Sequence, residues 1–155
     1  MGRDQAGGLS RRGALLAAAG AMAAMLAPRL AAATPAAVAE ALARLQAGRP
    51  VSQGRIRIDL PLIAENGQSV PLTVAVDSPM TAADHVAALH VFAEGNPLPG
   101  VASFRFTPAC GRAVASTRIR LAQSQNVVCL AEMSDGRLFA AKTEVRVTVG
   151  GCGAG

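Results

Sequence analysis

From residue 54 to residue 149, apolar and polar residues alternate with a period of two, which is the pattern of strands that bury one face. Turn signals rich in Gly, Asn, Asp, Ser and Pro separate these runs. We therefore expect seven or so short strands, over residues 55–60, 70–77, 86–93, 101–107, 113–122, 127–133, 138–140 and 142–149. Short strands at this spacing predict an all-β fold, an antiparallel immunoglobulin-like β-sandwich over residues 51–149. Because the chain has no Trp, "immunoglobulin-like" refers here to architecture alone.

A segment in which apolar residues have the spacing of a helix precedes the strands. Val38, Leu42 and Leu45 lie on one face of a helix. Thr34 is suited to cap its start, with a proline in the first turn, and a glycine and a proline follow its end. Residues 34–50 are thus expected to form a short helix and linker.

The first 33 residues have the layout of an export signal. The pair Arg11-Arg12 precedes an uncharged, Ala-rich run from Gly13 to Pro28, and small residues end the segment near Ala33. The run is shorter and less apolar than the roughly 20 residues of a membrane-spanning helix. Residues 1–33 are therefore predicted to be a twin-arginine signal peptide, cleaved after transport to the periplasm, which leaves no membrane attachment.

The basic character of the chain is concentrated in this leader. The whole sequence has a net charge of +5, but residues 34–155 hold eleven basic and nine acidic residues. This remainder has no cluster of Lys or Arg, and the chain has neither Trp nor Tyr for base stacking. Nucleic-acid binding is not expected.

The most informative residue for function is a cysteine that is fourth from the C-terminal end of the sequence. Cys152 follows Gly150 and Gly151 and precedes Gly153, Ala154 and Gly155. Glycine permits wide backbone freedom, so residues 150–155 are predicted to form a flexible arm that carries a thiol into the cleft of another protein. A free thiol has a pKa near 8.5, and the arm has no His, Lys or Arg to activate it. Activation must come from the enzyme that the arm enters, which is typical of a carrier.

Several motifs resemble those of the SoxY family, the sulfur-carrier subunits of the periplasmic thiosulfate-oxidising Sox system. The resemblance begins with the twin arginine and ends with the C-terminal motif, usually Gly-Gly-Cys-Gly-Gly, in which Ala154 replaces the last glycine here. Between them it follows residues 61–67, 70–74, 76–81, 90–97 and 116–122.

The resemblance implies a function and a set of partners. Cys152 would be the covalent attachment point for sulfur, and the chain would form a heterodimer with a SoxZ-like subunit. Its transient partners would be the haem protein SoxAX, the hydrolase SoxB and, where present, a sulfane dehydrogenase. The chain itself would be a carrier without catalytic activity, with no metal and no cofactor beyond the sulfur intermediates held on Cys152.

Two other functions remain as alternatives. A non-catalytic periplasmic binding module could use Cys152 for an intermolecular disulfide. A thiol enzyme is less well supported, because no activating group lies near the thiol in the sequence.

The remaining candidate residues have structural explanations. Cys110 and Cys129 could be separate thiols or a disulfide, and if residues 122–126 form a hairpin turn Cys129 should face Ile119. His85 and His90 are an odd number of positions apart on one strand, which disfavours a shared metal site. Arg118 and Arg120 share one face of a strand, which favours a solvated face or a partner-binding edge over an anion site.

Apolar residues occupy both alternations in the strands over 70–77, 86–93 and 101–107, more than one buried face requires. We therefore expect an apolar surface that a partner subunit covers in a heterodimer.

Overall fold

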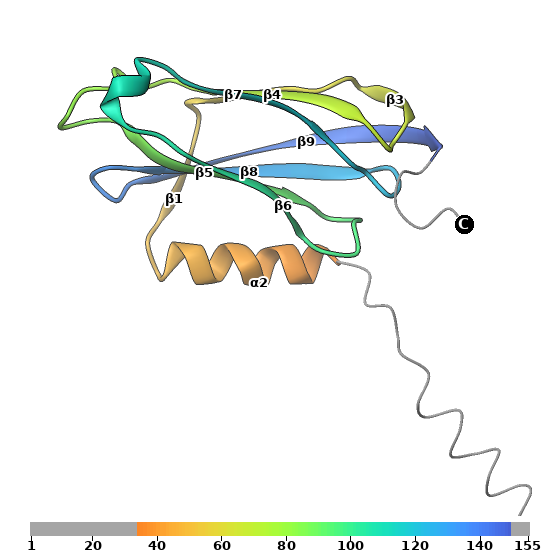
Figure 1. The fold of residues 1–155 in the computed structure, drawn as a ribbon. Coiled ribbons are helices and arrows are strands. Elements are labelled where there is room, and N and C mark those ends of the chain that lie inside the picture. Colours follow the sequence, from red (N-terminus) through yellow and green to blue (C-terminus); the bar gives the residue numbers. More distant parts are fainter. Residues whose placement is uncertain (1–33, 150–155) are drawn as a thin grey trace, which may run out of the picture. The chain divides into compact units, whose positions relative to one another are not determined.

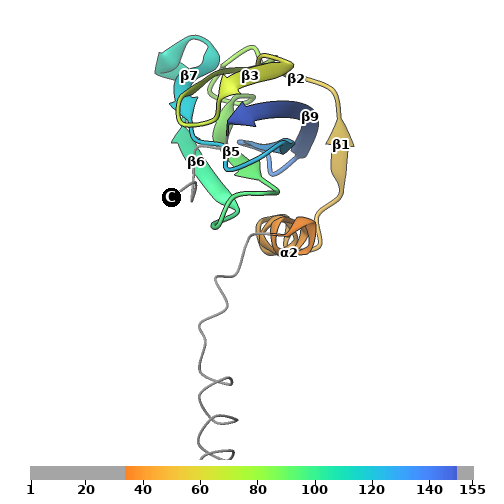
Figure 2. The same cartoon turned by 90° about the vertical axis from the view of Figure 1, so that its right-hand side faces the viewer.

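The computed structural model describes residues 34–149. Its elements in chain order are the helix α2 (Pro35–Gln46) and the strands β1 (Val51–Gln53), β2 (Ile56–Asp59), β3 (Ile63–Asn66), β4 (Val70–Val76), β5 (Val86–Ala93), β6 (Gly100–Arg105), β7 (Ala113–Ile119), β8 (Gln125–Met133) and β9 (Leu138–Val149), with a 3₁₀ turn, η2 (Pro108–Cys110), between β6 and β7. The strands form two facing sheets (Figures 1 and 2). The predicted immunoglobulin-like sandwich is confirmed.

One layer is a six-stranded sheet in the order β1-β9-β8-β5-β6, with β3 also paired to β9. The other is a three-stranded antiparallel sheet in the order β2-β4-β7. In β4, inward residues such as Leu72 and Val74 are buried, and the residues between them are exposed or half-buried. The period-two pattern in the sequence therefore corresponds to the two faces of this sheet.

The main hydrophobic core lies between the sheets. Leu72 and Val74 of β4 belong to the same buried cluster as Leu89 and Val91 of β5 and Val145 of β9. All five are at most 1% exposed. This cluster fixes the register of the strands, because a shift by one residue would turn their apolar side chains to the outer face.

The predicted helix is confirmed, and it covers the outer face of the larger sheet (Figure 1). The Thr34 side chain accepts a hydrogen bond from the Ala37 amide at 3.3 Å, and Pro35 occupies the first turn. Val38, 1% exposed, packs with Phe92 and Leu130 in a second hydrophobic cluster. The second apolar alternation of β5, which we expected a partner to cover, is thus covered in part by the chain's own helix.

Two short pairings depart from the antiparallel prediction. β1 and β3 both run parallel to β9, with Val51 opposite Leu138 and Ala64 opposite Val147. Neither strand could be predicted from the pattern, because β1 has three residues and β3 four, and β3 ends at a turn signal. The two C-terminal runs, 138–140 and 142–149, are one continuous strand, β9.

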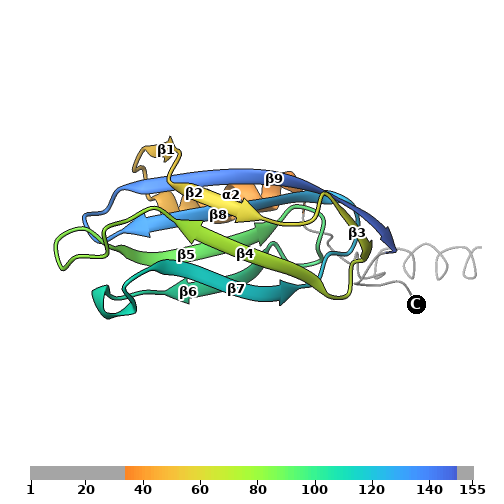
Figure 3. The same ribbon diagram turned by 90° about the horizontal axis from the view of Figure 1, so that it is seen from above.

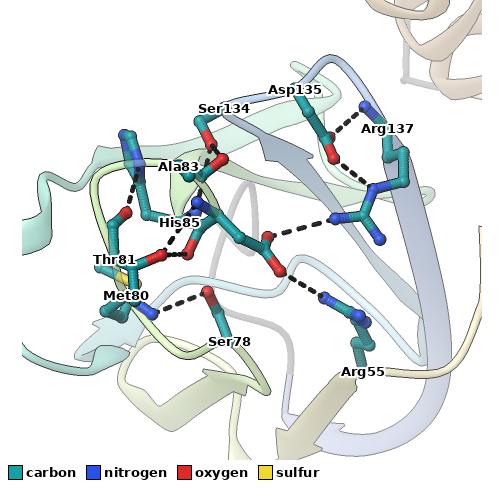
Figure 4. Close-up of polar contacts among 10 residues, drawn as sticks. Arg55, Ser78, Met80, Thr81, Ala83, His85, Ser134, Asp135 and Arg137 are labelled. Carbon is teal, nitrogen blue, oxygen red and sulfur yellow. Dashed lines mark hydrogen bonds and ion pairs between the residues drawn. The ribbon is translucent and has the colours of Figure 1, made fainter.

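A polar network closes the end of the sandwich formed by the β4–β5 loop and the β8–β9 hairpin (Figure 4). Asp84 lies between two guanidinium groups, 3.2 Å from Arg137 and 3.9 Å from Arg55. The amide of His85 donates to Ser134 Oγ at 3.1 Å, which ties the loop to the hairpin. We assign this network a structural role.

No helix in residues 34–149 has the length and apolar character needed to cross a membrane.

Candidate functional site

Cys152, the arm residues Gly150, Gly151, Gly153, Ala154 and Gly155, and the export residues Arg11 and Arg12 lie outside the described residues. The structure does describe the point from which the arm begins, the end of β9 at Val149 (Figure 3). The candidate site is therefore built from the residues around Val149.

The end of β9 is hydrogen-bonded to its neighbours up to its last residue. Val149 is opposite Asn66 of β3, and the Gly67 amide donates to the Val149 carbonyl at 2.7 Å. The Gly67 carbonyl in turn accepts from the Leu121 amide at 2.8 Å. The turn after β3 thus links the start of the arm to the loop after β7, so the arm begins from a fixed point.

Beside this point a buried pair of amide side chains holds two loops together. Asn96 is 8% exposed and Gln125 is 7% exposed. Asn96 Nδ2 donates to the Arg120 carbonyl at 2.8 Å, and its Oδ1 accepts from the Ala122 amide and from Gln125 Nε2, both at 3.0 Å. Gln125 Oε1 accepts from the Gly95 amide. A buried polar network is stabilising only when each of its polar atoms has a hydrogen-bond partner. Every buried side-chain N or O atom within residues 34–149 has such a partner.

The two loops approach closely at Gly95. A Cβ there would lie 2.9 Å from Gln123 Nε2, the end of a flexible side chain, and 3.2 Å from Gln125 Cβ. A side chain at this position would therefore require Gln123 to move and Gln125 to shift by a few tenths of an ångström.

Glu94 stabilises the end of the sandwich at which the arm begins. Its carboxylate accepts from Asn126 Nδ2 at 2.7 Å and from Lys142 Nζ at 2.9 Å. Burial opposes ionisation of Glu94, but the two hydrogen bonds and the Lys142 charge outweigh it and hold the pKa of the carboxyl below its ordinary value.

Apolar side chains are exposed next to the start of the arm. Leu62 is 76% exposed, Ile63 63% and Val149 55%. They belong to β9 and to the segment that pairs with it, since the Arg146 amide donates to the Leu62 carbonyl at 2.9 Å and Ile63 is opposite Arg146. This exposed apolar surface lies outside the strands over 70–77, 86–93 and 101–107, for which we expected a covering partner, and it adjoins the start of the arm.

The two other cysteines are separate free thiols in the structure, so the disulfide considered from the sequence is not formed. Cys110 is exposed in η2, whereas Cys129 is buried in β8 and faces Val91 and Ala141 on its neighbouring strands. The expectation that Cys129 faces Ile119 is wrong, because β7 and β8 belong to different sheets. Burial raises the pKa of the Cys129 thiol to about 12.

The histidines have local hydrogen-bond partners. His90 Nδ1 lies 2.9 Å from Ser103 Oγ, and His85 Nδ1 lies 3.0 Å from the Thr81 carbonyl. Within residues 34–149, no three His, Cys, Asp or Glu side chains are grouped closely enough to hold a metal.

Sequence reasoning missed the Asn96–Gln125 pair. Polar residues in a turn are expected to be solvated, and nothing in their spacing says that two of them are buried. The available signal was the motif over residues 90–97, which contains Glu94, Gly95 and Asn96.

The structure defines a β-sandwich whose last strand ends at Val149, three residues before Cys152 in the sequence. The family profile described as "Sulfur oxidation protein SoxY" matches residues 42–152. A solved structure of the sulfur carrier protein SoxY from Chlorobium limicola f thiosulfatophilum is 34% identical, with a TM-score of 0.61, and the alignment covers 72% of this chain and 96% of that one. The chain belongs to the SoxY family of sulfur oxidation proteins.

Other solved structures share the architecture at low identity. A superoxide reductase (neelaredoxin) from Ignicoccus hospitalis is 20% identical, with a TM-score of 0.53 and coverage of 61% of this chain and 80% of that one. A superoxide reductase from Nanoarchaeum equitans is 13% identical, with a TM-score of 0.50 and coverage of 62% and 100%. At these identities the likeness shows the fold alone. Comparison with curated proteins finds no match.

Proposed function

We propose that this protein is a periplasmic covalent sulfur carrier in thiosulfate oxidation, with Cys152 as the attachment point. The observation that carries the proposal is the SoxY match, which extends through residue 152 and so includes the glycine-flanked cysteine. The named function of the Chlorobium relative, a sulfur carrier, supports it.

The first step on the carrier is an oxidative coupling. The Cys152 thiol and thiosulfate form a sulfur–sulfur bond, giving Cys–S–S–SO₃⁻, and release one proton and two electrons to the haem of a SoxAX-type partner. Water then cleaves the terminal sulfur–sulfur bond on a SoxB-type hydrolase, which releases sulfate and leaves a persulfide on Cys152. A sulfane dehydrogenase, where present, would oxidise that sulfur further.

This chain contributes attachment and presentation rather than catalysis. Its arm begins at Val149, which is held by Gly67, so the thiol is presented from a defined edge of the sandwich. Exposed Leu62, Ile63 and Val149 adjoin that edge and suit contact with the entrance of a partner's cleft or with a SoxZ-type subunit.

The test compares Cys152→Ser with Cys110→Ser, which removes the exposed thiol of η2 and serves as the matched control. Thiosulfate-dependent reduction of the haem partner should be lost in the first variant and retained in the second. Intact mass of the native protein should show thiosulfonate or persulfide adducts on Cys152. Retained turnover in Cys152→Ser, or disulfide-linked dimers without sulfur adducts, would favour the binding-module alternative.

Export by the twin-arginine route is part of the proposal, because the haem and hydrolase partners are periplasmic. Replacing Arg11-Arg12 with Lys-Lys should leave the precursor in the cytoplasm. Normal periplasmic amounts of the variant would show that another route carries the protein.

A further inference from the structure

An open cavity lies on the outer face of the smaller sheet, where β4 ends. It has a volume of about 280 Å³, and residues of β2, β4 and β7 line it. Figure 3 shows this face with β4 between β2 and β7. The helix α2 packs against the larger sheet and leaves this face open to solvent (Figure 1).

Arginines from both flanking strands line the cavity. Arg57 of β2 is opposite Ala75 of β4, and Ala75 is opposite Val114 of β7. Arg112 directly precedes β7 and lies on the same face as Val114, because Ala113 between them is buried in the core. Ala75 and Val114 thus form the floor of the cavity, and Arg57 and Arg112 border it from two sides.

These two arginines have no counter-ion among the described residues. Both are exposed, and within residues 34–149 neither Arg57 nor Arg112 forms an ion pair with a carboxylate. Because their like charges face one cavity, they repel each other. An anion between them would replace this repulsion with two attractions.

A third arginine is held in place at the rim. The Arg55 guanidinium lies 5.1 Å from the centre of the Phe139 ring and 3.9 Å from the Asp84 carboxylate. The Arg55 carbonyl accepts from the Asp77 amide at 2.7 Å, and the Asp77 carboxylate also lines the cavity, where it opposes an anion. Three guanidinium groups and one carboxylate leave a net charge of +2, which complements a dianion.

The directions of the donors favour a tetrahedral ligand. Arg57 comes from β2, Arg112 precedes β7, and Ser78 follows the end of β4. Ser78 Oγ accepts from the Met80 amide at 3.2 Å, which leaves its hydroxyl hydrogen to donate. A planar carboxylate matches a single guanidinium fork. A tetrahedral oxyanion presents oxygens in several directions and can meet donors on three sides.

We propose that this cavity binds a small tetrahedral dianion of the sulfate and thiosulfate class, with Arg57 and Arg112 as its main ligands. Binding is noncovalent and draws on charge-assisted hydrogen bonds from the guanidinium groups. The inference goes beyond the proposed carrier function, because the site does not involve Cys152.

The site is too far from the start of the arm to hold a group carried there. β4 begins at Val70, close to the Gly67 turn that holds Val149, and it ends at Val76 beside the cavity. Six residue steps along a strand span about 20 Å. Cys152 is three residues beyond Val149, and three residues reach at most about 10 Å even when extended. The anion must therefore come from solution.

The test is a titration followed by NMR. The protein is the ¹⁵N-labelled mature chain, residues 34–155, which contains both hydrophobic clusters and carries Cys152→Ser so that sulfur chemistry at the arm cannot contribute. The probes are sodium sulfate, sodium thiosulfate and sodium acetate, with sodium chloride used to keep the ionic strength constant. The signals to follow are the amides of Ala75 and Val114 and the Nε–H groups of Arg57 and Arg112.

We expect sulfate and thiosulfate to shift these signals to saturation, and acetate to bind at least about fivefold more weakly. Arg57→Gln/Arg112→Gln should lower the affinity for sulfate about tenfold, in line with two exposed charge-assisted contacts. Asp77→Asn should raise it about threefold, because that variant removes a repulsive charge.

The matched control is Arg118→Gln/Arg120→Gln, which makes the same charge change on the same sheet but at a different cavity. It should bind sulfate as the parent does. Equal weakening in the two double variants would overturn the proposal, as would shifts that stay linear and spread over all exposed arginines, which indicate screening alone. Acetate binding as tight as that of sulfate would refute the tetrahedral site. None of these results bears on the carrier function, which turnover and the mass of Cys152 adducts test separately.

Discussion

The side-chain amide of Gln125 donates a hydrogen bond to the side-chain carbonyl of Asn96 over 3.0 Å, and both side chains are more than nine-tenths buried. Through this contact the first residue of β8 is joined to the loop that follows β5. The same Asn96 also holds the backbone of Arg120 and Ala122 after β7. The two loops next to the start of the arm therefore depend on one asparagine.

We predict that Asn96→Ala lowers the free energy of unfolding by about 2–3 kcal/mol, because it leaves the buried Gln125 side-chain amide and two partly buried backbone groups, the Arg120 carbonyl and the Ala122 amide, without the partner that Asn96 provides. Urea unfolding followed by circular dichroism measures the change. The control is Asn66→Ala, which removes an exposed asparagine whose side chain accepts from the Gln68 amide. That variant should lose about 1 kcal/mol or less. Equal losses would show that the Asn96 network contributes no more than an ordinary turn.

The second prediction concerns thiol reactivity. In the Cys152→Ser protein, native alkylation at pH 8 should modify Cys110 alone, because Cys110 is exposed and the buried Cys129 thiol has a pKa of about 12. Denaturation should expose Cys129 and give a second adduct. Intact mass counts the adducts, and peptide mapping locates them. No adduct before reduction and two after it would mean that Cys110 and Cys129 are joined by a disulfide, contrary to the structure.

The fold could be predicted from the sequence because the apolar alternation, the turn residues and the helix-capping residues indicated the same secondary-structure elements. The period-two runs predicted all the strands of the described residues except the short β1 and β3, and the turn residues predicted where they end. The helix could also be predicted, because Thr34 and Pro35 mark its start and Val38 lies on its buried face. What the pattern could not give was the assignment of strands to sheets. β7 and β8 are adjacent in sequence, but they belong to opposite layers, so pairing them misplaced Cys129 opposite Ile119.

The candidate site was predicted only in part, for a related reason. Cys152 lies between glycines in a motif of consecutive residues, so the motif can be recognised from the sequence alone. The surroundings of the arm depend on contacts between distant segments, such as Asn96 with Gln125 and Gly67 with both Val149 and Leu121. Arg118 and Arg120 share one face of a strand, which favours a solvated face or a partner-binding edge, and both residues are exposed in the structure.

The third prediction tests the helix as a cover for the larger sheet. Val38→Ala should lower the free energy of unfolding by roughly 2 kcal/mol, because Val38 is 1% exposed and packs against Phe92 and Leu130. Arg44→Ala, on the exposed face of the same helix, should lose about 0.5 kcal/mol or less despite its ion pair with Glu40. Urea unfolding compares the two. A tolerated Val38→Ala would mean that the helix contributes little to stability and that its face is available to a partner.

The last prediction is a pH dependence that originates at His90. Burial lowers the pKa of the His90 imidazole below its ordinary value of 6.5; the Glu132 charge opposes this shift, and the Arg105 charge adds to it. Between the folded and unfolded pKa values the unfolded chain binds the proton and the folded chain does not, so protonation favours unfolding. The contribution of His90 to the free energy of unfolding is therefore fully present above pH 6.5 and decreases as the pH falls below that value. Glu94 and Asp135, whose pKa values are lowered from 4.5 and 3.8, titrate below this window. Urea midpoints at pH 7.5 and 5.5 should differ more in the parent than in His90→Gln, which retains a polar side chain opposite Ser103. An equal pH response in the two proteins would assign the dependence to other groups.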